Sequence, residues 1–298
     1  MNFEIFPQLI LNSLIAGSIY AVGAAGLAVI YSLFGFFNFA HGQAMMLGAY
    51  FFYLYNVLIG ADILATIVLF LFSIIVFSLI ILKIFILPFK KFHPILTLIS
   101  TLCLGVIIES LVSIFFGVNV KTFAGFENPK SIEVFSFFIT PLQIKIIFFS
   151  LIFIGALAFF FNSSSFGRLF KALAERETVG ESLGINKTSF FYFAFATAIL
   201  MAAISGIMLG FETNLQPTMG HAHTPKVFAA MLLGGVGNLW GTIVGSYFLA
   251  LIENIVAGID LYGYSLSVSF KDSVALICII LILLFKPTGL FRRCSRNL

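Results

Sequence analysis

Two carboxylates, Glu109 and Glu253, lie inside apolar stretches long enough to cross a membrane, and they are the first candidates for chemistry in this chain. An ionisable side chain at membrane depth is costly, so its default interpretation is functional, for example as a step in a proton relay. The alternative is structural: each carboxyl faces the helix bundle, protonated or hydrogen-bonded, or lies near a membrane boundary. Asn254 stands beside Glu253, and we favour the structural role for both carboxylates.

Histidines are weaker candidates. His41 follows Asn38 by three residues, and a single histidine without a partner more often stabilises a helix break than it binds a metal. His221 and His223 stand among prolines and glycines, which indicates an outer surface loop in preference to a weak metal site. The chain has no HExxH, GxSxG or paired-cysteine motif, and Gly180–Thr188 has the wrong spacing for a Walker A loop. We predict no enzyme activity, no metal and no cofactor on this chain.

Charge gathers in one internal stretch, Gly167–Thr188. Its charged residues are Arg168, Lys171, Glu175, Arg176, Glu177, Glu181 and Lys187. The part from 168 to 183 has no proline and many helix-forming residues, which predicts a short helix that stops at Gly184. Leu173 and Val179 do not give this helix a strong amphipathic stripe. The stretch is either a docking site for a partner or a linker with solvated charges.

Composition places the rest of the chain in lipid. The 298 residues are 61% hydrophobic and 9% charged, with a mean hydropathy of +1.13, whereas a soluble domain usually carries about 25% charged residues. The net charge of +4 is spread over several loops, which does not suggest nucleic-acid binding. The three cysteines have no disulfide or metal spacing. No basic start typical of a signal peptide precedes the first apolar run, which we expect to be retained.

Eight apolar runs of spanning length follow one another along the chain. They cover roughly residues 9–34, 40–59, 62–82, 94–117, 141–161, 189–211, 226–257 and 266–286. The runs are continuous and do not alternate as the strands of a barrel would. They predict an all-α, polytopic transmembrane helical bundle that forms a single domain over residues 1–298.

Lysine and arginine in the loops set the predicted orientation. They concentrate after the third run, in the charged stretch and in the tail, so these segments and the C-terminus are predicted to be cytoplasmic. Loop 118–140 has balanced charges and is predicted to be outside. Run 226–257 must then begin and end on one side, although it is too short for two full crossings at about 1.5 Å per residue. We predict a broken, re-entrant pair with its break at Gly234–Gly241.

A similar glycine-rich passage, Gly35–Gly42, occurs near the start of the chain, with looser correspondence in spacing. Paired interrupted segments in the two halves of a transporter often line its pathway. The predicted pathway residues are Asn38, His41, Gly42, Gly235, Gly237 and Asn238. The alternative is that these glycines let helices pack closely. If 35–60 is also re-entrant, which we favour, the N-terminus is cytoplasmic; if this segment crosses fully, the N-terminus is outside.

Several motifs resemble those of known transport proteins. The stretch from Gly167 to Asn186 resembles the cytoplasmic coupling loop of bacterial ABC importer permeases. Asn38–Gly42, Leu233–Asn238 with the glycines that follow it, and Phe285–Leu290 resemble the branched-chain amino acid permease family, in particular its H-type subunit. The resemblance extends over nearly the whole chain, in order.

The resemblance implies an inner-membrane permease subunit of a bacterial ABC importer for branched-chain amino acids. Its partners would be a second related permease, two cytoplasmic ATPases that bind the ATP, and an extracytoplasmic binding protein. The coupling loop would extend over 162–188. Within it, the residues implied to contact an ATPase are Arg168, Ala174, Glu175, Glu181, Gly184 and Ile185.

Two alternatives remain open at this point. The form of residues 238–242 resembles the urea and short-amide branch of the same machinery. A proton-coupled secondary transporter that uses Glu109 or Glu253 belongs to another class.

Overall fold

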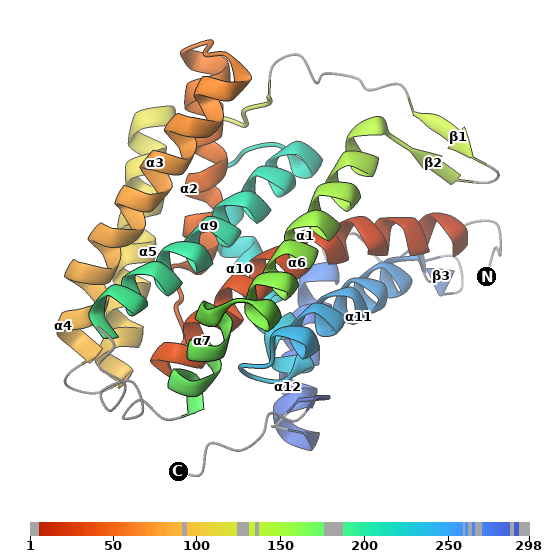
Figure 1. Ribbon diagram of the computed structural model, residues 1–298. Coiled ribbons are helices and arrows are strands. Elements are labelled where there is room, and N and C mark those ends of the chain that lie inside the picture. Colours follow the sequence, from red (N-terminus) through yellow and green to blue (C-terminus); the bar gives the residue numbers. More distant parts are fainter. Residues whose placement is uncertain are drawn as a thin grey trace.

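The computed structural model describes residues 6–90, 94–123, 131–134, 137–175, 187–258, 260–261, 264–265, 270–286 and 289–291. Almost every regular element is a helix (Figure 1). The helices are α1 (Phe6–Phe34), α2 (His41–Tyr53), η2 (Leu54–Leu58), α3 (Ile63–Ile81), η3 (Leu82–Ile86), α4 (Leu87–Lys90), α5 (Pro94–Phe116), α6 (Pro141–Ser163), α7 (Ser165–Glu175), α9 (Lys187–Thr213), α10 (Met219–Gly234), α11 (Leu239–Ala257) and α12 (Phe270–Phe285). Two short antiparallel hairpins pair β1 (Ile132–Val134) with β2 (Phe137–Ile139) and β3 (Asp260–Leu261) with β4 (Tyr264–Ser265).

Within the described residues, six helical segments are long and apolar enough to cross a membrane. They are Phe6–Phe34, Ile63–Phe89, Ile95–Phe116, Pro141–Ser163, Thr188–Thr213 and Leu239–Ala257. Two of the predicted apolar runs give shorter helices, namely α2, which continues into the π-helical turn η2, and α12. The predicted all-α, polytopic bundle is confirmed.

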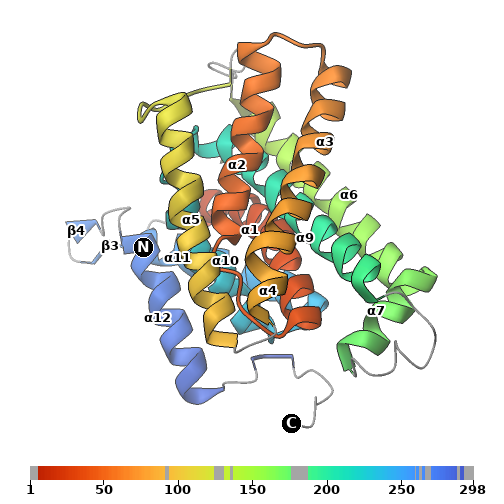
Figure 2. The same ribbon diagram turned by 90° about the vertical axis from the view of Figure 1, so that its left-hand side faces the viewer.

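Helix α1 forms the core of the bundle. Of the most apolar 18-residue stretch of α1, 89% is buried. The corresponding share is 22% in the segment Ile63–Phe89, which contains α3 and lies at the periphery. The buried part of α1 is rich in glycine, alanine and serine, and such small residues allow close helix packing where lipid provides no hydrophobic driving force. Figure 1 shows α1 crossing the middle of the bundle between α9 and α11, and Figure 2 shows α2, α4 and α5 in front of it.

The ends of the helices divide into two groups. At the first end, which we call the hairpin end, the side-chain amide of Gln8 bonds both backbone groups of Phe138 in β2. At this end Lys121 also pairs with Leu215 after α9, and Gly258 after α11 lies against Leu9. At the opposite end, the α7 end, Figure 1 places α4, α7 and the last turn of α12. The described parts of two segments predicted to be cytoplasmic, α4 and α7, are therefore at the same end of the bundle.

The N-terminal part of α1 lies at the hairpin end, beside the loop predicted to be outside. Helix α2 returns to this end. Its last residues, Phe52 and Tyr53, meet the ring of Phe123 at centroid distances of 5.6 and 6.4 Å, and Phe123 follows closely on Lys121, which pairs with Leu215 at the hairpin end. Segment 35–60 therefore crosses the bundle, and the favoured interpretation, a re-entrant segment with α1 starting at the opposite face, is wrong. The glycine-rich break comes after α1 has crossed, and not in the middle of a crossing.

Helix α10 begins at Met219, seven residues before the predicted start of the apolar run. The prediction of an outer surface loop is therefore wrong for His221 and His223, which lie in the first turns of this helix. Pro225 stands inside α10, beyond its first turn, where it lacks the N–H that would bond the carbonyl of His221. Prolines and glycines are more typical of loops than of helices, and the sequence therefore indicated a loop here.

Candidate functional site

The first helix break separates α1 from α2 and is held by side chains predicted to line the pathway. Asn38 accepts a hydrogen bond from the backbone N–H of Ala40 at 3.1 Å, as asparagine does in tight turns. The Nε2–H of His41 donates to the carbonyl of Gly23 in α1 at 2.8 Å. Asn38 and His41 are each only 1% exposed. In this conformation, both side chains fix the turn and its contact with α1.

The second break, at 235–238, separates α10 from α11, as predicted for the Gly234–Gly241 passage. Gly235 adopts φ 112° and Gly237 φ 76°, conformations that side chains with a Cβ rarely take. Asn238 then caps α11 by accepting from the N–H of Gly241 at 3.1 Å. The two asparagines of the similar passages therefore make similar contacts, since each accepts the backbone N–H of a residue two or three positions further along the chain.

The two breaks lie near each other. The hydroxyl of Ser32, close to the end of α1, donates to the carbonyl of Gly237 at 3.2 Å. Gly42 lies where α2 meets α10, because a Cβ on Gly42 would overlap the carbonyl of Gly220 and the hydroxyl of Thr224. The structure thus joins α1 and α2 of the first passage to both helices of the second. That these residues line the pathway stays a prediction.

A buried charged cluster connects α1, α10 and α11. Glu253 of α11 is 2% exposed and accepts a hydrogen bond from the Tyr20 hydroxyl of α1 at 3.0 Å. Lys226 of α10, 8% exposed, places its Nζ 4.0 Å from the same carboxylate oxygen and 5.9 Å from the centre of the Tyr20 ring. Burial among partners agrees with the structural role favoured for Glu253. The sequence analysis missed Lys226, although a lysine and a glutamate inside one predicted broken pair could have indicated an ion pair.

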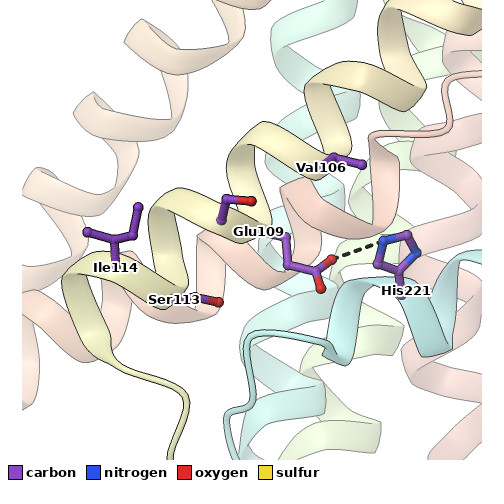
Figure 3. A pocket seen from close by; sticks show the side chains of 6 residues that line it. Val106, Glu109, Ser113, Ile114 and His221 are labelled. Atoms are coloured by element: carbon purple, nitrogen blue, oxygen red, sulfur yellow. Dashed lines mark ion pairs between the residues drawn. The ribbon is translucent and has the colours of Figure 1, made fainter.

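The other predicted carboxylate, Glu109 of α5, occupies a different environment. Its Oε2 lies 3.0 Å from Nε2 of His221 in α10, an ion pair when the imidazole is protonated. The side chain of Glu109 is 23% exposed and that of His221 is 60% exposed. Figure 3 shows the two side chains pointing toward each other from neighbouring helices. The pairing of Glu109 could not be predicted while His221 was placed in a loop.

Helix α7 forms the described part of the predicted coupling loop. Phe170, Leu173 and Ala174 are buried against the bundle, with the Phe170 ring 4.6 Å from that of Phe161. Arg168 and Lys171 are exposed on the other side. The expectation of no strong amphipathic stripe is therefore wrong for α7, because the buried stripe is formed by Phe170, Leu173 and Ala174 and does not depend on Val179.

The coupling residues are distributed unevenly over the described structure. Arg168 lies on the exposed side of α7 and donates to the Ser165 hydroxyl at 2.9 Å. Ala174 is on the buried side, and Glu175 ends the helix. Glu181, Gly184 and Ile185 lie outside the described residues. Contact of this loop with an ATPase stays a prediction.

Comparison with known proteins gives matches over nearly the whole chain. Residues 9–283 match the family model described as the permease component of a branched-chain amino acid transport system. The chain is 30% identical over 305 residues to the high-affinity branched-chain amino acid transport system permease protein LivH of Salmonella typhimurium, covering 98% of this chain and 97% of that protein. It is 29% identical over 302 residues to the corresponding protein BraD of Pseudomonas aeruginosa, covering 97% and 96%.

A solved structure has the same overall fold. It is a chain of PsaBC from Streptococcus pneumoniae in complex with Fab, with a TM-score of 0.51 and 12% identity over 93% of this chain and 91% of that one. At this identity the likeness concerns the fold alone. The family model and the full-length relatives together carry the assignment: the chain belongs to the permease family of branched-chain amino acid transport systems.

Proposed function

We propose that this chain is a permease subunit of an ATP-driven importer that moves branched-chain amino acids through a bacterial inner membrane. The observation that carries the proposal is the likeness to LivH and BraD along almost the entire chain, in a bundle of apolar helices. As a permease the chain is a transport subunit and not an enzyme. Two cytoplasmic ATPases, a second related permease and an extracytoplasmic binding protein would complete the machine.

The α7 end is proposed to face the cytoplasm and the hairpin end the outside. Lys83, Lys90 and the exposed cations of α7 lie toward the α7 end, and basic loops are retained on the cytoplasmic side. In this orientation the buried face of α7 holds it to the bundle, while its charged face is open to an ATPase. Movement of the ATPases would then tilt the helices between outward-facing and inward-facing states.

The energy source of uptake is the direct test of the proposed function. Leucine uptake into vesicles that hold the complete transporter is expected to need ATP inside and loaded binding protein outside. Uptake should survive a protonophore, because no proton gradient drives it. Collapse of uptake at constant ATP would favour a proton-coupled transporter. Excess isoleucine and valine should compete with leucine, and competition by urea alone would favour the short-amide branch.

Substitutions in the charged stretch test coupling. Gly184→Trp, or Glu175→Lys combined with Glu181→Lys, is expected to lower leucine transport about tenfold or more, a typical size for a coupling between distant sites. Stimulation of the ATPases by loaded binding protein should fall in parallel, with normal membrane insertion. Lys121→Glu at the hairpin end is the control and should leave both activities near normal. Unchanged transport and stimulation in the loop variants would contradict the coupling role.

A further inference from the structure

A pocket of about 350 Å³ opens between α5 and the first turns of α10 (Figure 3). Its lining residues are Val106, Glu109, Ser110, Ser113, Ile114 and His221. The volume lies in the range of small-molecule sites, about 300–1,000 Å³. The lining combines a carboxylate, an imidazole and two hydroxyls with two branched apolar side chains, which is the mixture of groups that small polar ligands require.

The pocket lies on a face that is otherwise apolar. Along α5 the exposed neighbours of Glu109 include Val106, Ile107 and Ile114, and the whole helix belongs to a segment apolar enough to span a membrane. A partly exposed carboxylate at this depth is costly in contact with lipid, and such residues almost always face a bundle interior or a water-filled cavity. This face of α5 and α10 is therefore suited to border a transport pathway and not the hydrocarbon.

The chemistry of the lining matches one class of substrate. A carboxylate binds an ammonium group through charge-assisted hydrogen bonds, and hydroxyl and imidazole N–H groups donate to a carboxylate. We propose that the pocket binds a zwitterionic α-amino acid, with its ammonium at Glu109 and its carboxylate at His221 and Ser113. Val106 and Ile114 would contact the branched side chain. This subsite rests on the proposed import of branched-chain amino acids.

The contact between Glu109 and His221 has a role in this scheme. Glu109 and His221 lie 3.0 Å apart, so each side chain occupies the place that the opposite end of a zwitterion would take beside the other. His221, with 60% of its side chain exposed, has room to swing from Glu109 toward an incoming carboxylate. A neutral ligand such as urea offers no charge to replace either partner. The pocket should therefore favour zwitterions over amides, amines and acids that lack one of the two charges.

A cysteine reporter tests binding without the binding protein, whose own affinity would otherwise dominate uptake. In a variant with Cys103, Cys278 and Cys294 replaced by alanine, Ser110→Cys would be labelled with a small water-soluble thiol reagent in the purified complete transporter. Millimolar leucine is expected to slow labelling several-fold, while urea, isoamylamine and isocaproate slow it little. Ile59→Cys, exposed at the hairpin end, is the control and should be labelled equally with and without leucine.

A second variant tests whether leucine protects Ser110→Cys by binding at Glu109 or only by covering the thiol. Glu109→Gln should raise the leucine concentration that gives half-protection about tenfold or more, the size expected for loss of a charge-assisted contact. Glu212→Gln, which removes a carboxylate that Gln143 binds at the hairpin end, should leave it unchanged. If leucine gives no protection, or protects equally in Glu109→Gln, the subsite is wrong. ATP-driven leucine uptake by the parent transporter in that case would leave the proposed function standing.

Discussion

Gly206→Ala is expected to prevent normal assembly of the bundle, although it adds a single methyl group. Gly206 lies in α9 where this helix crosses α2, and a Cβ there would overlap the backbone carbonyl of Met45 and lie 2.8 Å from its Cα. Backbone atoms cannot rotate away as a side chain can, so the two helices must separate. Overpacking of this kind costs about 1–3 kcal/mol or more, and it acts on the contact between α2 and α9.

The matched control is Gly155→Ala in α6. Nothing lies within 4 Å of a Cβ at Gly155, and the residue is exposed, so the same substitution should be neutral or slightly stabilising, since alanine favours a helix over glycine by about 1 kcal/mol. Thermal unfolding and size-exclusion profiles of the purified chain in lipid nanodiscs compare the two. Equal melting temperatures for Gly206→Ala and Gly155→Ala would contradict close packing of α9 on α2.

The second helix break could be predicted because two independent signals agree on it. Counting crossings required a segment that begins and ends on one side, and the glycines of 234–241 gave the only natural place for the turn. The structure breaks the helix at 235–238 and returns α11 to the hairpin end. Such signals are local or follow from simple geometry, so the sequence alone contains them.

The pairing of charges could not be predicted in the same way. Glu109 and His221 are 112 positions apart, and nothing in their local sequence indicates that α5 and α10 pack together. The prolines and glycines around His221 have the composition of a loop, yet a helix starts there and packs against α2, where Gly220 meets Gly42. Tyr20 likewise meets Glu253 across 233 positions. Sequence reasoning found both carboxylates from their cost in lipid, but their partners depend on tertiary structure.

The side of the N-terminus illustrates another limit. The glycines and asparagine of Gly35–Gly42 indicate a break, but they do not say how far α1 has travelled before it. Because α1 is 29 residues long, it completes its crossing first, and α2 then provides a second crossing. A break signal in sequence therefore marks a turn without marking its depth.

Glu253→Gln is expected to cause the largest loss of stability among conservative changes at buried charges. The substitution keeps the shape of the side chain but takes the negative charge from beside Lys226, which is 8% exposed. Removing one member of a buried ion pair typically costs about 3–5 kcal/mol, because the remaining charge loses the opposite charge beside it. The loss should appear as a lower melting temperature in nanodiscs and as less folded protein in the membrane.

The two partners should not respond equally. Lys226→Met leaves Glu253 with the hydrogen bond from Tyr20 at 3.0 Å, and a carboxyl can take up a proton and become neutral. We therefore expect Lys226→Met to be milder than Glu253→Gln. The double variant should be more stable than Glu253→Gln alone, because it removes both charges together. Additive losses in the double variant, measured in the same unfolding experiment, would show that the two charges do not interact and that the cluster stabilises the bundle through Tyr20 and packing.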